Sequence, residues 1–118
     1  MKYIKLFEDH NYSVYDFILM DVEQSRSLLL NEIKKKDPDL ELVKDILAYS
    51  VVDVNSKDSF GYTALMQAAY WGKEKCVELL LNHPGIDRTL KNKSGYTAWY
   101  LAKPQIREQF PQLNPNFR

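Results

Sequence analysis

The sequence predicts an all-α fold in which helix-turn-helix units stack on one another and are joined by β-hairpin-like loops. One observation is that part of the chain recurs after a displacement of 34 residues. A second is that in each copy a glycine turn is followed by apolar residues at helical spacing. The chain has 118 residues, of which 45% are hydrophobic, and this is the size and composition of one packed domain. Units of this kind bury their apolar stripes against their neighbours, so the expected architecture is a solenoid.

The repeat is clearest at the start of each unit. Residues 58–65 reappear at 92–99, and the four residues Gly-Tyr-Thr-Ala are identical in both copies. The same displacement carries Ala68 onto Ala102 and, toward the N-terminus, Val77 onto Val43. We therefore predict a repeat domain over 21–118, with repeats at about 21–57, 58–91 and 92–118.

The helix boundaries follow from local signals. In the central unit Thr63 is placed to cap a first helix, Gly72 to end it, and residues 73–82 to form a second helix with Cys76 on its apolar stripe. The first unit has predicted helices at 21–36 and 40–48, separated by residues 37–39. In the last unit Pro104 stands where the first helix ends, and 105–110 remain for a shortened second helix.

Residues 1–20 match no repeat, but they are rich in apolar side chains. Fewer than three full repeats seldom bury enough surface to be stable, so we expect this segment to cover the end of the stack as a helix or a short hairpin. The alternative is that it mediates self-association.

The central unit resembles the ankyrin repeat. The matching residues are Asp58, Gly61, Thr63, Ala64, Leu65, Ala68, Ala69, Gly72, Val77, Leu80, Leu81, Gly85 and Asp87. Two positions depart from the pattern, because Ala64 and Met66 stand where the family usually has Pro and His. The loss of the Pro removes some rigidity from the first helical turn without forbidding the fold.

The resemblance implies that partners bind a concave surface formed by the loop tips and the outer ends of the first helices. In the central repeat these positions hold Ser59, Phe60, Tyr62, Tyr70 and Trp71. In the last repeat they hold Lys93, Ser94, Tyr96, Pro104 and Gln105, and Tyr100 corresponds to Met66. Aromatic residues are favoured at the centres of interfaces, so we take these positions as a candidate protein-binding site.

A second interpretation of the same rings is packing. Phe60 and Trp71 would then lie along neighbouring helices or against the N-terminal segment and shield a small core. Trp99 replaces Leu65 in the repeat and is expected in the core, whereas Tyr100 fits either interpretation.

The sequence gives little support to nucleic-acid binding, to a metal site, to catalysis or to a membrane span. Sixteen basic and sixteen acidic residues give no net charge, which disfavours nucleic acid and leaves room only for a local charged patch. Cys76 and two widely separated histidines do not supply a zinc-ligand set, and no phosphate-binding loop or catalytic motif is present. We therefore expect no metal, no cofactor and no enzymatic activity. No apolar run reaches the roughly 20 residues of a membrane span, and we expect a cytoplasmic protein.

The function expected from the sequence is the binding of another protein, with the target blocked or sequestered, as an inhibitor does. A structural subunit that self-associates through its N-terminal segment is the alternative. An enzyme or small-ligand binder would need a deep pocket, whereas surfaces in the resembled family are usually shallow. Fold alone does not name the partner.

Overall fold

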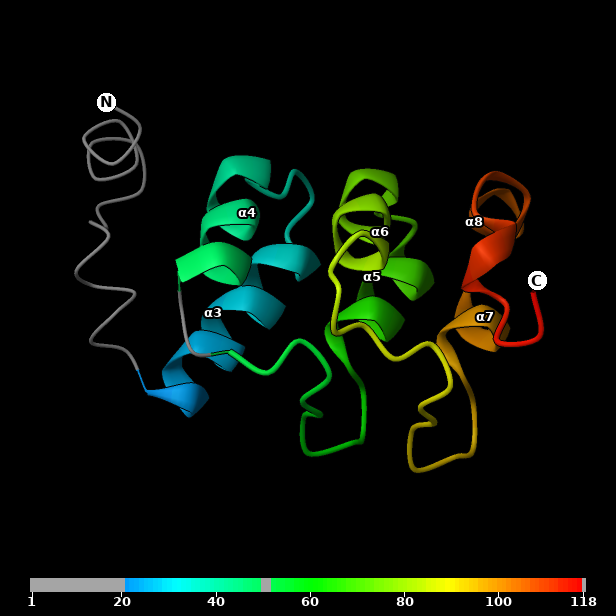
Figure 1. Ribbon diagram of the computed structural model, residues 1–118, viewed down its shortest axis with the longest axis horizontal. Coiled ribbons are helices and arrows are strands. Elements are labelled where there is room, and N and C mark those ends of the chain that lie inside the picture. The colour runs from blue at the N-terminus through cyan, green and yellow to red at the C-terminus, as the bar shows by residue number, and fades with distance from the viewer. Residues whose placement is uncertain (1–20, 50–51, 118) are drawn as a thin grey trace. The chain divides into compact units, whose positions relative to one another are not determined.

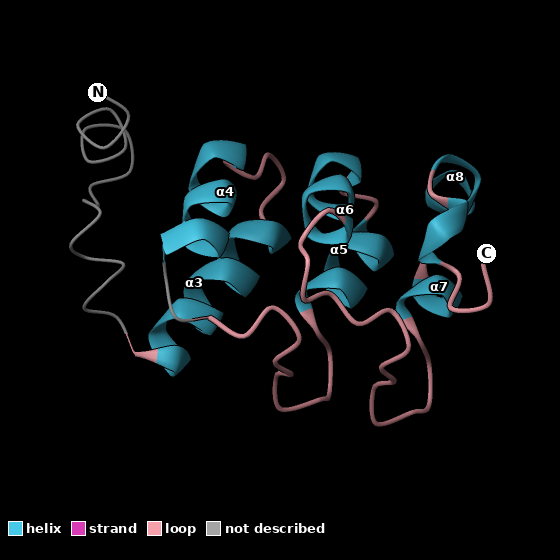
Figure 2. Ribbon diagram, in the orientation of Figure 1, coloured by secondary structure: helices cyan, strands magenta, loops and turns pink. Residues whose placement is uncertain are grey.

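The computed structural model describes residues 21–49 and 52–117, and within them it is all-α without a strand, as predicted (Figures 1 and 2). These residues belong to two compact units that divide between Asp53 and Val54. Each unit is described by itself below. The predicted cap at 1–20, and with it the proposed route of self-association, lies outside the described residues.

The first unit contains α3 (Val22–Lys34) and α4 (Leu40–Tyr49), close to the predicted helices. Asp21 caps α3, because its Oδ1 accepts the N–H of Gln24 at 2.7 Å while the Gln24 side chain accepts the N–H of Asp21 at 3.0 Å. The buried carboxylate of Glu32 accepts the N–H of Asp39 at 2.9 Å and the Lys35 ammonium at 2.9 Å. Glu32 therefore fixes the turn that leads into α4.

The second unit begins with α5 (Ala64–Trp71) and α6 (Glu74–Leu81), which pack on each other. Thr63 Oγ1 accepts the N–H of Met66 at 3.2 Å, and the sulfur of Met66 accepts the N–H of Thr63 at 3.4 Å. Met66 thus completes a reciprocal cap at the position where the resembled family usually has His. Gly72 ends α5 with φ of 71°, as predicted, and Cys76 is buried as predicted.

The last repeat is shortened. Its helices are α7 (Ala98–Leu101) and α8 (Pro104–Gln109), followed by the 3-10 turn η1 (Pro111–Leu113). The prediction that Pro104 marks the end of the first helix is wrong. The first helix, α7, ends at Leu101, and Pro104 is the first residue of the second helix, α8. A proline disfavours helical backbone in the residue before it, and α7 therefore stops at Leu101 while Lys103 is extended.

Two loops in this unit are built alike and project on the same side, away from α6 and α8 (Figure 1). The first loop closes when Asp58 donates its N–H to the carbonyl of Tyr62 at 2.9 Å. The second closes when Asn92 donates to the carbonyl of Tyr96 at 3.0 Å. These are the predicted hairpin-like loops, and each leads directly into the first helix of its repeat, α5 or α7.

Candidate functional site

The side chain of Asp58 shapes the first loop. Its Oδ1 accepts the backbone N–H of Phe60 and that of Tyr62, each at 2.9 Å. Gly61, with φ of 84°, turns the chain between them and donates its N–H to the carbonyl of Asp58. Because the loop is closed around Asp58, the ring of Phe60 points outward and is 71% exposed.

The second loop repeats this construction with an amide. Asn92 Oδ1 accepts the N–H groups of Ser94 and Tyr96 at 2.9 and 3.0 Å. Lys93 and Ser94 at the tip are exposed, as is Ser59 in the first loop. Equivalent loop positions in the two repeats therefore present side chains in equivalent places.

The two loops are in direct contact. The N–H of Lys93 donates to the carbonyl of Phe60 at 3.4 Å, and the ammonium of Lys57 donates to the carbonyl of Lys91 at 2.9 Å. A Cβ atom placed on Gly61 would lie 2.9 Å from the backbone N of Lys93. This close approach fixes the spacing between the loop tips.

The C-terminal end of α5 carries two aromatic rings. Tyr70 and Trp71 are in edge-to-face contact with their centroids 5.0 Å apart, and Trp71 is 50% exposed. The indole N–H of Trp71 donates to Gln67 Oε1 at 3.1 Å, and Gln67 Nε2 donates to Asp58 Oδ2 at 3.3 Å. A chain of hydrogen bonds therefore ties the rings at the end of α5 to the loop that holds Phe60.

The last repeat contributes a second pair of rings. Tyr96 and Tyr100 stack with centroids 4.3 Å apart and planes inclined by 10°, and Tyr100 is 59% exposed. Behind them Trp99 is half-buried beneath the guanidinium of Arg107, which lies 5.4 Å from the ring centroid. Arg107 also donates to the carbonyls of Trp99 and Tyr100, at 2.8 and 2.6 Å. The short helix α7 is thus held in place from α8.

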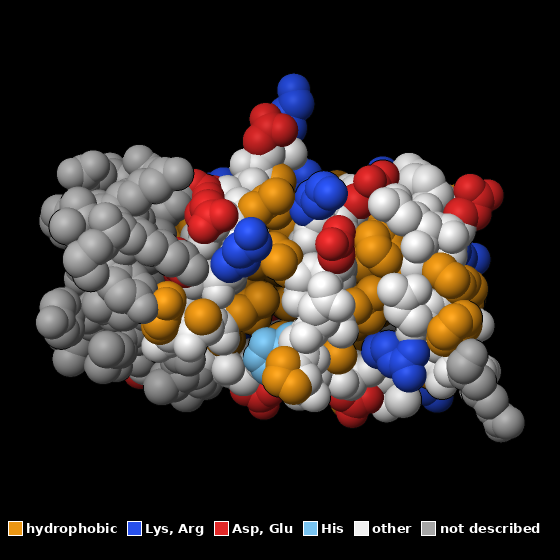
Figure 3. Space-filling model, turned by 45° about the horizontal axis from the view of Figure 1, so that its top comes forward, with side chains coloured by type: hydrophobic (Ala, Val, Ile, Leu, Met, Phe, Trp, Pro, Cys, Tyr) orange, Lys and Arg blue, Asp and Glu red, His pale blue; other side chains and the backbone are white. Residues whose placement is uncertain are grey.

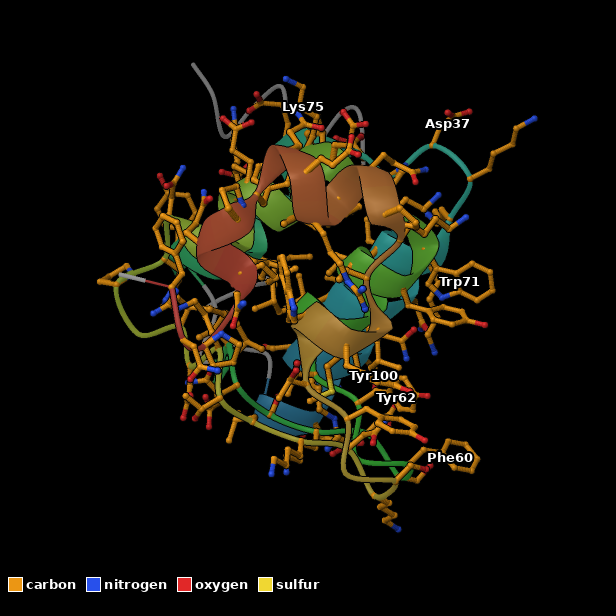
Figure 4. All side chains as sticks on the ribbon, turned by 90° about the vertical axis from the view of Figure 1, so that its right-hand side faces the viewer. Asp37, Phe60, Tyr62, Trp71, Lys75 and Tyr100 are labelled. Atoms are coloured by element: carbon orange, nitrogen blue, oxygen red, sulfur yellow. The ribbon has the colours of Figure 1, made fainter. Side chains whose placement is uncertain are left out.

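We use the term aromatic surface for the rings of Phe60, Tyr62, Tyr70, Trp71, Tyr96 and Tyr100. Figure 4 shows the four of them that it labels pointing outward along one side of the unit, in the order Trp71, Tyr100, Tyr62 and Phe60. Tyr62 is half-buried and the other five are exposed. Phe60 and Trp71 are exposed within the described residues, whereas the alternative in which they pack against the N-terminal segment concerns residues 1–20, outside that part of the chain. Trp99, which the sequence assigned to the core, is only partly covered.

Two predicted positions stand apart from this surface, and one neighbour of it was not predicted. Pro104 and Gln105 are exposed, but they begin α8 and do not extend the first helix of their repeat. Gln67 was missed, although a lone polar residue within the apolar run of α5 is a signal for a specific hydrogen bond. Its contacts with Asp58 and Trp71 become apparent only in three dimensions.

The groups that carry chemistry elsewhere in this unit have structural roles. His83 Nδ1 accepts the N–H of Gly85 at 3.0 Å, so the imidazole holds the turn that follows α6. The pKa of Asp87 is lowered, because its carboxylate accepts hydrogen bonds from the hydroxyl and the backbone N–H of Thr89.

Among residues 21–49 and 52–117, no three His, Cys, Asp or Glu side chains are grouped as metal ligands. Within the same residues, none of the helices has the length and apolar character needed to span a bilayer.

Comparison with known proteins places this chain in a family. Residues 29–105 match the family model described as ankyrin repeats in three copies. The rat ankyrin repeat and SAM domain-containing protein 6 is 49% identical over 58 residues, which are 48% of this chain and 6% of the relative. Mouse protein phosphatase 1 regulatory subunit 12A is 39% identical over 71 residues, or 60% of this chain and 7% of the relative. The chain thus spans only a small part of the length of these two relatives.

A bacterial relative and a crystal structure extend the comparison. The putative ankyrin repeat protein YahD of Escherichia coli is 33% identical over 79 residues, covering 63% of this chain and 39% of the relative. The ankyrin domain of Osh1 from Kluyveromyces lactis superimposes with a TM-score of 0.51 at 20% identity, over 87% of this chain and 51% of the other. At that identity the likeness shows the fold alone. The family match covers more than half of the residues, and the chain belongs to the ankyrin-repeat family.

Proposed function

We propose that this chain binds another protein through its aromatic surface. The observation that carries the proposal is that four aromatic rings from two successive repeats point outward along one side of the unit (Figure 4), and that Tyr70 and Tyr96 are in contact with two of them. Five of these six rings are exposed. Clustered apolar rings in contact with water are a typical mark of an interaction site, whereas single exposed hydrophobic residues are common on any protein.

Four of the six rings are held by contacts within the unit, which favours binding. Tyr70 and Trp71 contact each other, the Trp71 indole is hydrogen-bonded, and Tyr96 is stacked on Tyr100. A side chain that is fixed before association loses less rotamer freedom when a partner covers it. Truncation of a ring at the centre of an interface costs about 2 to 4 kcal/mol of binding free energy, or roughly 30-fold to 1,000-fold in affinity.

The family supports the general part of this proposal. Ankyrin repeats are protein-protein interaction modules, and their fold is typically a scaffold without catalytic activity. One of the relatives is named a regulatory subunit of protein phosphatase 1, and a subunit by definition associates with another protein. For this chain we propose that binding blocks or sequesters the partner, because the partner's residues that the aromatic surface covers become inaccessible to other molecules.

The double variant Tyr70→Ala with Trp71→Ala tests the proposal. The unaltered protein and the variant are compared for thermal unfolding, for sedimentation behaviour and for capture of proteins from a lysate of the cells that produce the chain. Phe117→Ala is the matched control, because Phe117 is 48% exposed and lies outside the aromatic surface, beyond η1.

We expect the double variant to keep its fold and to lose a captured protein that the unaltered chain and the Phe117→Ala variant both retain. If the double variant unfolds, the rings are core residues and the site is wrong. If capture is the same for all three proteins, the rings are not the binding site. A size in solution that grows with concentration, and that depends on residues 1–20, would favour the alternative function of a self-associating structural subunit.

A further inference from the structure

The charge of the chain is unevenly distributed although its sum is zero. Residues 1–53 include seven basic and eleven acidic residues, a net charge of −4, whereas residues 54–118 include nine basic and five acidic residues, a net charge of +4. The aromatic surface belongs entirely to the second half. A partner that approaches this half therefore meets a positive field that the overall charge conceals.

Within the second half, the positive charge is concentrated near the aromatic surface. The segments that form this surface, 57–72 and 91–103, contain four lysines and a single acidic residue, Asp58. Both carboxylate oxygens of Asp58 accept hydrogen bonds from the loop and from Gln67, so Asp58 serves the scaffold and offers little to a partner.

Three of these lysines are available to a partner. Lys91, Lys93 and Lys103 are exposed, and in the part of the chain that the structure describes no carboxylate lies within ion-pair distance of them. The side of the molecule on which α6 and α8 lie is different, because acidic and basic side chains are interspersed there (Figure 3). Lys75 and Glu78 of α6, for example, are 4.0 Å apart.

The lysines stand at both ends of the aromatic surface. Lys93 lies beside Phe60 at the loop tips, since its N–H donates to the carbonyl of that residue. Lys103 lies beside the end of α5, since its N–H donates to the carbonyl of Ala69 at 3.3 Å. The side chain of Lys103 covers Gly72, where an added Cβ would be 3.1 Å from its Cδ. The rings thus lie between two lysine positions, Lys93 at the loop tips and Lys103 at the end of α5.

We infer that the segment of a partner that occupies the aromatic surface is an acidic peptide segment, with Asp or Glu side chains opposite Lys93 and Lys103 and apolar side chains over the rings. The inference rests on the proposed function and adds the chemistry of the partner. Exposed ion pairs add little affinity individually, but complementary charge speeds association and selects against neutral and basic sequences.

Single-stranded nucleic acid is also bound by aromatic rings among lysines. Base stacking, however, depends on open ring faces, and the stacking of Tyr96 on Tyr100 reduces the number of faces that are open to bases. An acidic peptide needs only ring edges, remaining faces and ammonium groups, all of which the surface offers. The surface therefore favours a peptide, and nucleic acid is included in the test as a competing ligand.

The experiment selects peptides from a random dodecapeptide library displayed on phage, with the unaltered chain as bait. A selected peptide is then synthesised with a fluorescein label, and its affinity is measured by fluorescence anisotropy at low and high salt. It is measured against the unaltered chain, the double variant Lys93→Glu with Lys103→Glu, and the control Lys75→Glu on α6. A twelve-nucleotide oligothymidine is the competing probe, and circular dichroism checks that each variant is folded.

We expect selected peptides to be enriched in Asp and Glu over the starting library. The double charge reversal should weaken binding about tenfold or more at low salt, the Lys75→Glu control less than twofold, and high salt should shrink the difference as exposed charges are screened. The double variant Lys93→Gln with Lys103→Gln removes the two charges without reversing them, so it should weaken binding less than the charge reversal and more than Lys75→Glu. It takes the place of the charge reversal if that variant does not fold.

Several results would overturn the inference. These are an absence of enriched peptides, selected peptides that are neutral or basic, an affinity that survives the charge reversal, and oligothymidine that binds more tightly than the acidic peptide. Dimerisation that the charge reversal abolishes would show instead that the acidic half of a second copy occupies the surface. If a cellular protein is lost with Tyr70→Ala and Trp71→Ala but kept with the charge reversal, the proposed function stands and only the acidic partner is wrong.

Discussion

Gly61 and Gly95 offer a matched test of how the two loops pack. They hold equivalent positions in successive repeats, and their φ angles of 84° and 86° are nearly the same. Their surroundings differ. A Cβ on Gly61 would lie 2.9 Å from the backbone N of Lys93 and 3.2 Å from Cα of Asn92, whereas a Cβ on Gly95 would meet no atom within 4 Å.

The expected magnitudes follow from these distances. Alanine at either position must adopt left-handed backbone, which costs about 1 to 2 kcal/mol. At Gly61 the new methyl group also presses on backbone atoms that can yield only if the loops separate, and overpacking of this kind adds roughly 1 to 3 kcal/mol. Gly61→Ala should therefore lower the free energy of unfolding by about 2 to 5 kcal/mol, and Gly95→Ala by about 1 to 2 kcal/mol.

Urea unfolding followed by circular dichroism measures both variants under identical conditions. With a urea dependence of about 1 to 3 kcal/mol per molar, Gly61→Ala should move the midpoint roughly 1 M further than Gly95→Ala does. Equal losses at the two positions would refute the reasoning, because the loop-to-loop contact would then contribute nothing beyond the backbone angle.

Three further predictions concern single side chains. Gln67→Leu should speed exchange of the Trp71 indole proton several-fold in NMR, since its acceptor is removed; unchanged exchange would contradict the described hydrogen bond. Ala64→Pro should raise the free energy of unfolding by about 0.4 to 1 kcal/mol, measured in urea, because proline suits the first position of a helix; a loss would show that the ring does not fit. Thr89→Val should raise the pKa of Asp87 toward its ordinary value in a carboxyl NMR titration. Because the folded pKa is lowered, this carboxylate stabilises the protein above its unfolded pKa, and the contribution is lost as the pH falls through the folded pKa; an unchanged pKa would dismiss Thr89 as the cause.

Much of the fold could be predicted because its signals are local. Thr63 and Thr97 cap their helices through hydrogen bonds to the residue three positions on, and Gly72 adopts the left-handed angle that ends α5. Such contacts depend on a few consecutive residues, which a repeat comparison aligns directly. The assignment of Pro104 failed because proline can follow one helix or begin another, and sequence position alone does not separate the two.

Only part of the candidate site could be predicted from the sequence. The repeat register indicated which loop and helix positions carry aromatic residues, and the structure leaves most of those rings exposed. The hydrogen bonds from Asp58 through Gln67 to Trp71 join residues that no periodic pattern pairs. The position of Lys103 beside Gly72 depends on the packing of successive repeats, so the sequence alone does not predict that Lys103 lies at the edge of the surface.

Photo-crosslinking tests the central claim, that the aromatic surface contacts a protein partner, most directly. The photoreactive amino acid p-benzoylphenylalanine is introduced in place of Phe60, of Tyr100 or of the control Phe117, and each protein is irradiated in a lysate of the cells that produce the chain. We predict the same covalent adduct from positions 60 and 100 and none from position 117. An adduct from position 117 alone, or no adduct from positions 60 and 100, would contradict the assignment of the aromatic surface as the binding site.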